Sequence, residues 1–143
     1  MRGLIVTAAL AAFAVLGFSA CGKEQENLAR RAYTFPNSKA IKSEWTIKTL
    51  PSGDTAMHGV AKEYYWGGSV KKSVVWKDGQ KDGSAQAWYD NGGQQWQKSY
   101  DKGRKTGTWR LFYSDGNPWI VMAFNAQGML EGKVQKWDRA DPS

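Results

Sequence analysis

The chain repeats itself at a fixed interval of 24 residues over its second half. The glycines that mark this interval are Gly59, Gly83, Gly107 and, one residue late, Gly132. Tyrosines and further glycines recur with the same step, namely Tyr65, Tyr89, Tyr113, Gly68, Gly92 and Gly116. An interval of this size is typical of solenoids and arrays, in which one small unit stacks on the next. The repetition therefore predicts an array of similar units.

Each unit has the composition of a β-hairpin. In the second unit, two runs rich in aromatic or β-branched residues flank Asn91-Gly92, and the third unit has Asp115-Gly116 in that place. Such dipeptides tolerate the positive φ that tight hairpin turns need. A second turn ends each unit, at Asp78-Gly79, Lys102-Gly103 and Gln127-Gly128. The sequence therefore predicts alternating strands and turns, and glycine recurs too often for helices.

This pattern resembles the bacterial variant of the MORN-type repeat (membrane occupation and recognition nexus). Two successive units carry the resemblance, through Gly83, Trp88, Tyr89, Asn91, Gly92, Tyr100, Gly103, Gly107, Phe112, Tyr113, Asp115, Gly116, Phe124, Gly128 and Gly132. In the first unit, Gly67 replaces the usual Asn or Asp. The resemblance implies an all-β, elongated array of β-hairpin repeats over residues 59–137. It also implies a binding role rather than a reaction, since such proteins are described as antitoxins of toxin–antitoxin systems or as lipoproteins.

The N-terminal segment has the pattern of an export signal. A positive start at Met1-Arg2 precedes an apolar, small-residue-rich stretch over residues 4–18. This stretch is short for a membrane-spanning helix, although an uncleaved anchor is the alternative. Residues 18–21 resemble the lipobox of bacterial lipoproteins, with Phe18 where Leu is commoner. We therefore expect a signal peptide over residues 1–20 and an acylated Cys21.

An acylated Cys21 implies a membrane location. Two or more acyl chains hold a protein firmly at a bilayer, whereas one binds only marginally. Gly22 follows instead of Asp, which by analogy with Gram-negative sorting favours the outer membrane, with the protein facing the periplasm. Since Cys21 is the only cysteine, no disulfide is expected within the chain.

The remaining boundaries follow from composition. Residues 21–32 are expected to be a polar tether, with a short helical turn over residues 28–32. Residues 33–58 are expected to be a degenerate capping repeat with a strand over residues 39–47, since terminal units of arrays are commonly atypical. Residues 138–143 are expected to be a flexible tail.

The aromatic residues divide into periodic and non-periodic positions. We expect the periodic ones to form the core and join the repeats, namely Tyr64, Tyr65, Trp88, Tyr89, Phe112, Tyr113 and Trp137. Trp66, Trp96 and Trp119 have no counterpart at each step, which favours an exposed binding face over the alternative of local gap filling.

The chain is basic, with a formal net charge of +7. Basic residues cluster around the expected strand ends and turns, namely Lys71, Lys72, Lys77, Lys81, Lys98, Lys102, Arg104 and Lys105. This cluster could contact an anionic partner, and Lys102 and Arg104 are the candidate contacts chosen from it. The alternative is that these residues are solvated and protect sheet edges. The export signal argues against nucleic acid as the partner.

Catalytic motifs are absent from the sequence. His58 is the only histidine, so neither a histidine-based metal cluster nor a convincing triad is expected. We expect no enzyme activity, no cofactor and no metal. The sequence predicts a membrane-anchored lipoprotein that binds a protein partner, as an antitoxin-like immunity protein or an envelope scaffold. The alternative is binding of anionic lipid or polysaccharide at the cell envelope.

Overall fold

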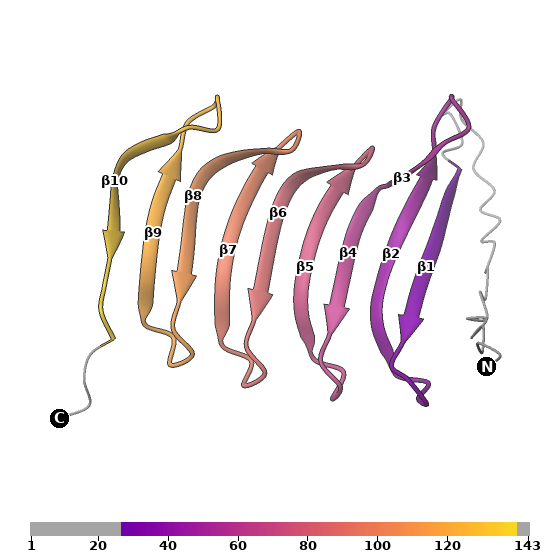
Figure 1. Cartoon of the computed structure of the whole chain (residues 1–143), viewed down its shortest axis with the longest axis horizontal. Helices are drawn as coiled ribbons and strands as arrows, with labels where there is room; N and C mark the ends of the chain where they lie inside the picture. Colours follow the sequence, from indigo (N-terminus) through magenta and orange to yellow (C-terminus); the bar gives the residue numbers. More distant parts are fainter. Residues whose placement is uncertain (1–26, 140–143) are drawn as a thin grey trace, which may run out of the picture.

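The computed structural model describes residues 27–139, which form one antiparallel sheet of ten strands and contain no helix (Figure 1). The strands are β1 (Leu28–Thr34), β2 (Ile41–Thr49), β3 (Thr55–Met57), β4 (Gly59–Tyr64), β5 (Val70–Lys77), β6 (Gln80–Trp88), β7 (Gln94–Asp101), β8 (Arg104–Phe112), β9 (Pro118–Phe124) and β10 (Leu130–Lys136). The expected all-β class, with hairpin-connected strands, is confirmed. Cys21, the expected signal peptide and the last four residues of the expected tail lie outside the described residues.

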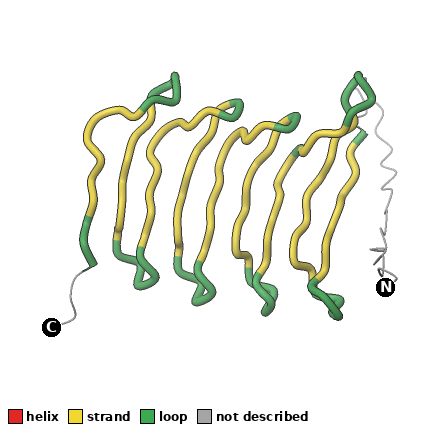
Figure 2. Tube along the Cα trace, in the orientation of Figure 1, coloured by secondary structure: helices red, strands yellow, loops and turns green. Residues whose placement is uncertain are grey.

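The strands follow one another across the sheet almost in chain order. The order is β1-β2-β4-β5-β6-β7-β8-β9-β10, and the short β3 pairs only with β2. Successive turns therefore alternate between the two long margins of the sheet, which is wider across the strands than along them (Figure 2). One margin joins β4 to β5, β6 to β7 and β8 to β9, and the opposite margin joins β5 to β6, β7 to β8 and β9 to β10.

Two kinds of turn connect the strands. In the β6–β7 turn, only Gly92 of the central residues has positive φ (81°), and the Gly93 N–H donates to Asn91 Oδ1 at 3.0 Å. In the β7–β8 turn, Lys102 and Gly103 both have positive φ, at 47° and 82°. Two successive positive φ angles define the type I′ turn, whose twist matches that of the strands it connects.

The sheet is a single layer, so burial comes from side chains of adjacent strands. Among the described residues, the buried hydrophobic side chains are Val74, Ala85, Ala87, Trp109 and Phe124. The Trp109 ring contacts Tyr100 and Phe124, with centroid distances of 5.2 and 4.8 Å. The core is therefore a thin strip along one face of β5 to β9.

The expected core was wrong in its membership. None of the periodic aromatics named for it is among the buried side chains, and Trp137 beyond β10 is 39% exposed. The reason is positional, because Tyr65, Tyr89 and Tyr113 lie where strands enter turns. Their hydroxyls instead donate to main-chain oxygens of the next hairpin, at Trp88 O (2.9 Å), Phe112 O (2.8 Å) and Trp137 O (2.9 Å).

The N-terminal part also differs from expectation. A helical turn was expected over residues 28–32, but these residues belong to β1, which pairs with β2 from Leu28↔Lys48 onward. The alternation of side chains in this segment was too short to distinguish helix from strand, and pairing with β2 decided it. The strand expected over residues 39–47 is present as β2, two residues further along.

Candidate functional site

Three lysines lie on the same face of the sheet as the buried strip. Lys81 is on β6, Lys98 on β7 and Lys105 on β8, opposite Trp76, Ala85 and Tyr100 respectively. Directly opposed residues in antiparallel strands share a face, so these pairs place the lysines beside the core. We call the set the aromatic–lysine face, which consists of Trp76, Lys81, Trp96, Lys98, Tyr100, Lys105, Trp109 and Phe124.

Each of the three ammonium groups lies over two aromatic rings. Lys98 Nζ is 4.5 Å from the centroid of Trp96 and 5.0 Å from that of Trp109. Lys105 Nζ is 5.3 Å from Trp109 and 5.1 Å from Phe124. Contacts within about 6 Å are attractive, because the ring face carries a partial negative charge. Rings and lysines thus alternate along the face.

Lys81 extends this alternation toward the N-terminal side. Its Nζ is 5.9 Å from the Trp76 centroid and 5.1 Å from that of Tyr100. Neighbouring strands lie about 4.8 Å apart, so the backbones of β6 and β8 are about 10 Å apart, with β7 and Lys98 between them. The positive charges therefore form a row across three strands.

These lysines are not neutralised by carboxylates of the described residues. The ion pairs found there include Lys72–Glu63 at 2.7 Å and Arg104–Asp101 at 3.2 Å, and none includes Lys81, Lys98 or Lys105. Burial lowers the pKa of Lys98, and the charges of Lys81 and Lys105 lower it further. Burial also raises the pKa of Tyr100.

The arrangement is suited to binding an anion. A carboxylate or phosphate placed among the ammonium groups would relieve their mutual repulsion, while the rings beneath hold the lysine stems in place. The face is open and spans several strands, so it fits an extended or macromolecular anionic surface. Positive charges that are partly withdrawn from water, as those of the half-buried Lys81 and Lys98 are, also interact more strongly with an anion than fully solvated ones.

The residues predicted for partner binding do not form one patch. Trp66 and Trp119 are 64% and 37% exposed, as expected, and lie near the same margin of the sheet. The Trp119 ring contacts Tyr113 at 5.8 Å. Trp96 is only half-buried beneath Lys98 and belongs to the aromatic–lysine face. Their positions in the sequence alone did not show that Trp66 and Trp119 lie near a margin whereas Trp96 lies on the aromatic–lysine face.

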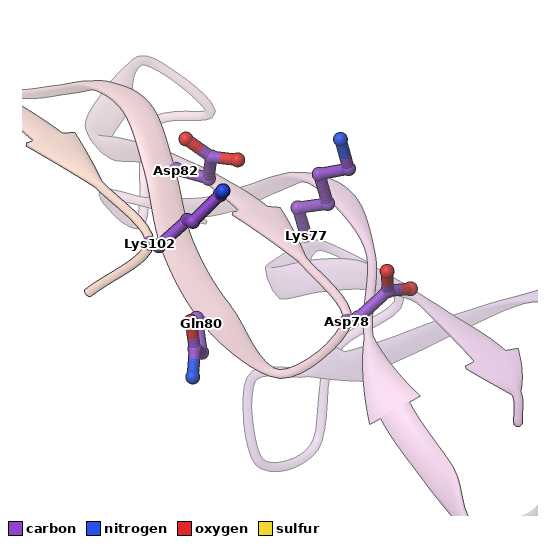
Figure 3. Close-up of a pocket in the computed structure, with 5 residues that line it drawn as sticks. All are labelled: Lys77, Asp78, Gln80, Asp82 and Lys102. Carbon is purple, nitrogen blue, oxygen red and sulfur yellow. The ribbon is translucent and has the colours of Figure 1, made fainter.

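Lys102 and Arg104 lie at the opposite margin. The Arg104 guanidinium pairs with Asp101 at 3.2 Å, and both side chains are exposed. Lys102 lines a shallow hollow of about 280 Å³ (Figure 3). The other residues that line it are Lys77, Asp78, Gln80 and Asp82.

The hollow has mixed charge. Asp78 Oδ1 lies 3.1 Å from His58 Nδ1 and 3.5 Å from Lys48 Nζ. Desolvation acts to raise the pKa of Asp78, but the hydrogen bond with His58 and the charge of Lys48 together lower it. At this margin Asp78 and Arg104 therefore have ionic partners, whereas Lys77 and Lys102 are in none of the ion pairs found among residues 27–139.

Sequence reasoning included Lys81, Lys98 and Lys105 in the basic cluster that could contact an anionic partner, but it did not single out Trp109. A signal for the lysine row was present, because Lys81 and Lys105 are themselves one 24-residue step apart. Trp96, Lys98 and Tyr100 also alternate with the period of a strand, which places them on one face. What the sequence did not show is which neighbouring strands bring these residues together.

Residues 27–139 contain no helix with the length and apolarity needed to cross a membrane. Comparison with protein-family models, curated proteins and solved structures found no significant match.

Proposed function

We propose that this protein is a membrane-anchored lipoprotein whose sheet binds an acidic protein partner through the aromatic–lysine face, without catalysing a reaction. The observation that carries this proposal is the row formed by Lys81, Lys98 and Lys105, which lies over aromatic rings and has no carboxylate partner among residues 27–139. Repulsion among these cations costs stability in the free protein. Binding of an acidic surface would recover that cost.

We further propose that residues 59–137 form a MORN-type array of hairpin repeats. Support comes from the hydroxyl bonds of Tyr65, Tyr89 and Tyr113, each of which reaches a main-chain oxygen 23 or 24 residues later. Gly59, Gly83 and Gly107 all have positive φ, at 80°, 108° and 62°. An array of this kind presents a broad surface built from equivalent positions, which suits protein binding.

Anchoring would follow from the proposed lipid on Cys21. Strand β1 begins at Leu28, seven residues later in the chain (28 − 21 = 7). Seven residues span at most about 25 Å even when fully extended, so the sheet would stay close to the bilayer. Replacing Cys21 by serine is expected to leave the protein unprocessed or soluble, as measured by fractionation and mass spectrometry. Normal processing and retention of Cys21→Ser at the membrane would contradict the lipoprotein proposal.

The partner proposal is tested by charge reversal. The double variant Lys98→Glu/Lys105→Glu is expected to lose a partner that the parent captures from solubilised membranes after cross-linking. The matched control is Lys39→Glu, an exposed lysine in the β1–β2 turn. Melting of each variant shows whether the sheet is intact. If the double variant folds and captures the same partner as the parent, the aromatic–lysine face is not the binding surface.

The alternative ligand is anionic lipid, and vesicles distinguish it. The full chain with Cys21→Ser is mixed with phosphatidylglycerol vesicles and with phosphatidylcholine vesicles. Selective binding to the anionic vesicles that Lys98→Glu/Lys105→Glu abolishes would favour lipid over protein. The neighbouring genes would distinguish an immunity protein from an envelope scaffold, because an adjacent gene for a secreted toxin would favour immunity.

A further inference from the structure

The outer edge of β10 has main-chain groups that point away from the sheet. The Trp137 N–H donates to Trp119 O at 3.0 Å, which directs this residue toward β9. Because hydrogen-bonding direction alternates along an antiparallel strand, the N–H and C=O groups of Lys136 and Val134 face the other way. Within residues 27–139, no strand pairs with this edge (Figure 1). Such an edge is a template for a further strand.

In β4, β6 and β8, the edge that corresponds to the outer edge of β10 pairs with the next strand. Strands β4, β6 and β8 each contain a positive-φ glycine that lies opposite an aromatic residue of the next strand. The pairs are Gly59↔Trp76, Gly83↔Tyr100 and Gly107↔Phe124. A ring across the ladder covers the backbone that a glycine leaves bare. Gly132 of β10 has the same positive φ, 72°, and no strand of the described residues lies opposite it on that side.

In β6 and β8, the edge that corresponds to the outer edge of β10 pairs regularly from the glycine onward. In β6, the residues from Gly83 to Ala87 pair with β7 without a shift, and in β8 the residues from Gly107 to Leu111 pair with β9 in the same way. The irregularity of β10 falls on its inner side, between Glu131 and Gln135, where it pairs with β9. The bulge therefore does not block a strand that approaches from outside.

The side chains along this edge define what would fit. Leu130 and Val134 are 51% and 46% exposed, so a partner strand would cover apolar surface. Lys133 and Lys136 are also exposed, and opposite charges in facing positions stabilise strand pairs. An antiparallel strand would place acidic residues opposite these lysines, an apolar residue opposite Val134 and a ring opposite Gly132.

We propose that the outer edge of β10 binds an extended segment of a partner protein as an additional antiparallel strand. In the direction of its own chain, that segment has the pattern acidic, any, apolar, acidic, aromatic. The inference rests on the proposed function only in taking the ligand to be a protein, and it concerns a different surface from the aromatic–lysine face. In strand addition of this kind, main-chain hydrogen bonds provide the affinity and alternate side chains provide the specificity.

A second copy of the chain is a poorer occupant. Pairing of two β10 edges would bring two strands together that each have Lys133 and Lys136 and only one carboxylate, Glu131. Like charges on facing strands are destabilising. The charge of the edge therefore favours an acidic segment.

The test uses a fluorescent peptide with Glu-Thr-Val-Glu-Phe at its centre, and a control peptide with these five residues reversed. Fluorescence anisotropy with the full chain, Cys21→Ser, is expected to show at least about tenfold tighter binding of the first peptide. The reversed order keeps the main-chain hydrogen bonds but no longer places acidic residues opposite Lys133 and Lys136 or a ring opposite Gly132. Hydrogen exchange is expected to slow at the Gly132, Val134 and Lys136 amides when it binds. Equal affinity for both peptides, or no binding, overturns the proposal.

Two variants separate main-chain from side-chain effects. Val134→Pro removes an outward N–H and is expected to weaken the peptide by about tenfold. Val134→Ala keeps that N–H and is expected to stay within about threefold of the parent. Equal binding by the parent and Val134→Pro, or dimerisation through β10 that the peptide does not reverse, would refute the proposal. Lys98→Glu/Lys105→Glu should bind the peptide normally, so the two proposals fail separately.

Discussion

Removal of the Trp109 ring tests where the stability of this single-layer sheet lies. Trp109 is 7% exposed, and its Nε1–H donates to Ser99 O at 3.0 Å. An aromatic side chain of this kind buries about 150–250 Å², and at about 25 cal/mol per Å² this amounts to about 4–6 kcal/mol. A compact unfolded state reduces this by about 10–40%. We therefore expect Trp109→Ala to lower the free energy of unfolding by about 3–4 kcal/mol.

Because this face of the sheet is open to water, the loss of stability in Trp109→Ala should not exceed this value. Water can enter the space left by Trp109, and Lys98 and Lys105 are freed to solvate, so a dry cavity does not add to the loss. Urea unfolding followed by circular dichroism measures the change. Trp66→Ala is the matched control, because Trp66 is 64% exposed and its removal should cost less than about 1 kcal/mol. A loss below about 1 kcal/mol for Trp109→Ala, or a larger loss for Trp66→Ala, would refute this account of the core.

Three further predictions concern turns and polar contacts. Gly92→Val is expected to destabilise the protein by about 1–3 kcal/mol because the Gly92 φ of 81° strains a β-branched residue. No atom lies within 4 Å of an added Cβ, so a steric clash would not contribute to this loss. Gly67→Val, where φ is not positive, should melt near the parent in thermal scans. Tyr89→Phe removes the hydroxyl bond to the neighbouring hairpin and should cost about 1 kcal/mol in urea unfolding; an unchanged midpoint would contradict the linking role. The hydrogen bonds that Glu44 accepts from the Tyr64 hydroxyl and Arg30 lower the pKa of Glu44. The stability that the Glu44 carboxylate contributes is therefore present above its unfolded pKa and is lost as pH falls through its folded pKa. Between pH 7 and pH 3, Glu44→Gln should lose less stability than the parent, and equal losses would show that Glu44 does not stabilise the fold in this way.

The hairpin character of the chain was predictable from local chemistry. Asn91-Gly92 and Asp115-Gly116 indicated turns, and both glycines have positive φ, at 81° and 89°. Such positions are readable because the requirement for positive φ is a property of the residue itself. The strand in place of a helical turn at residues 28–32 was not predictable in this way, because it depends on pairing with β2.

The candidate site was also predicted only in part from the sequence. Exposure of Trp66 and Trp119 followed from their non-periodic positions, and it agrees with the structure. Trp96 was grouped with them, although it lies beneath Lys98 at 4.5 Å on the aromatic–lysine face. Position within a repeat says how often a residue recurs, but it does not say which face of the sheet its side chain covers.

The sequence by itself determined the strand-and-turn alternation, the positions of the turn glycines that take positive φ and the basic, aromatic composition. These follow from the conformational preferences of single residues and dipeptides. The tertiary structure decided that the sheet remains one layer, that Trp109 rather than the turn tyrosines is buried, and that Lys81, Lys98 and Lys105 form a row. The physical reason is register, because the pairing of β5 to β9 sets which side chains from different strands meet.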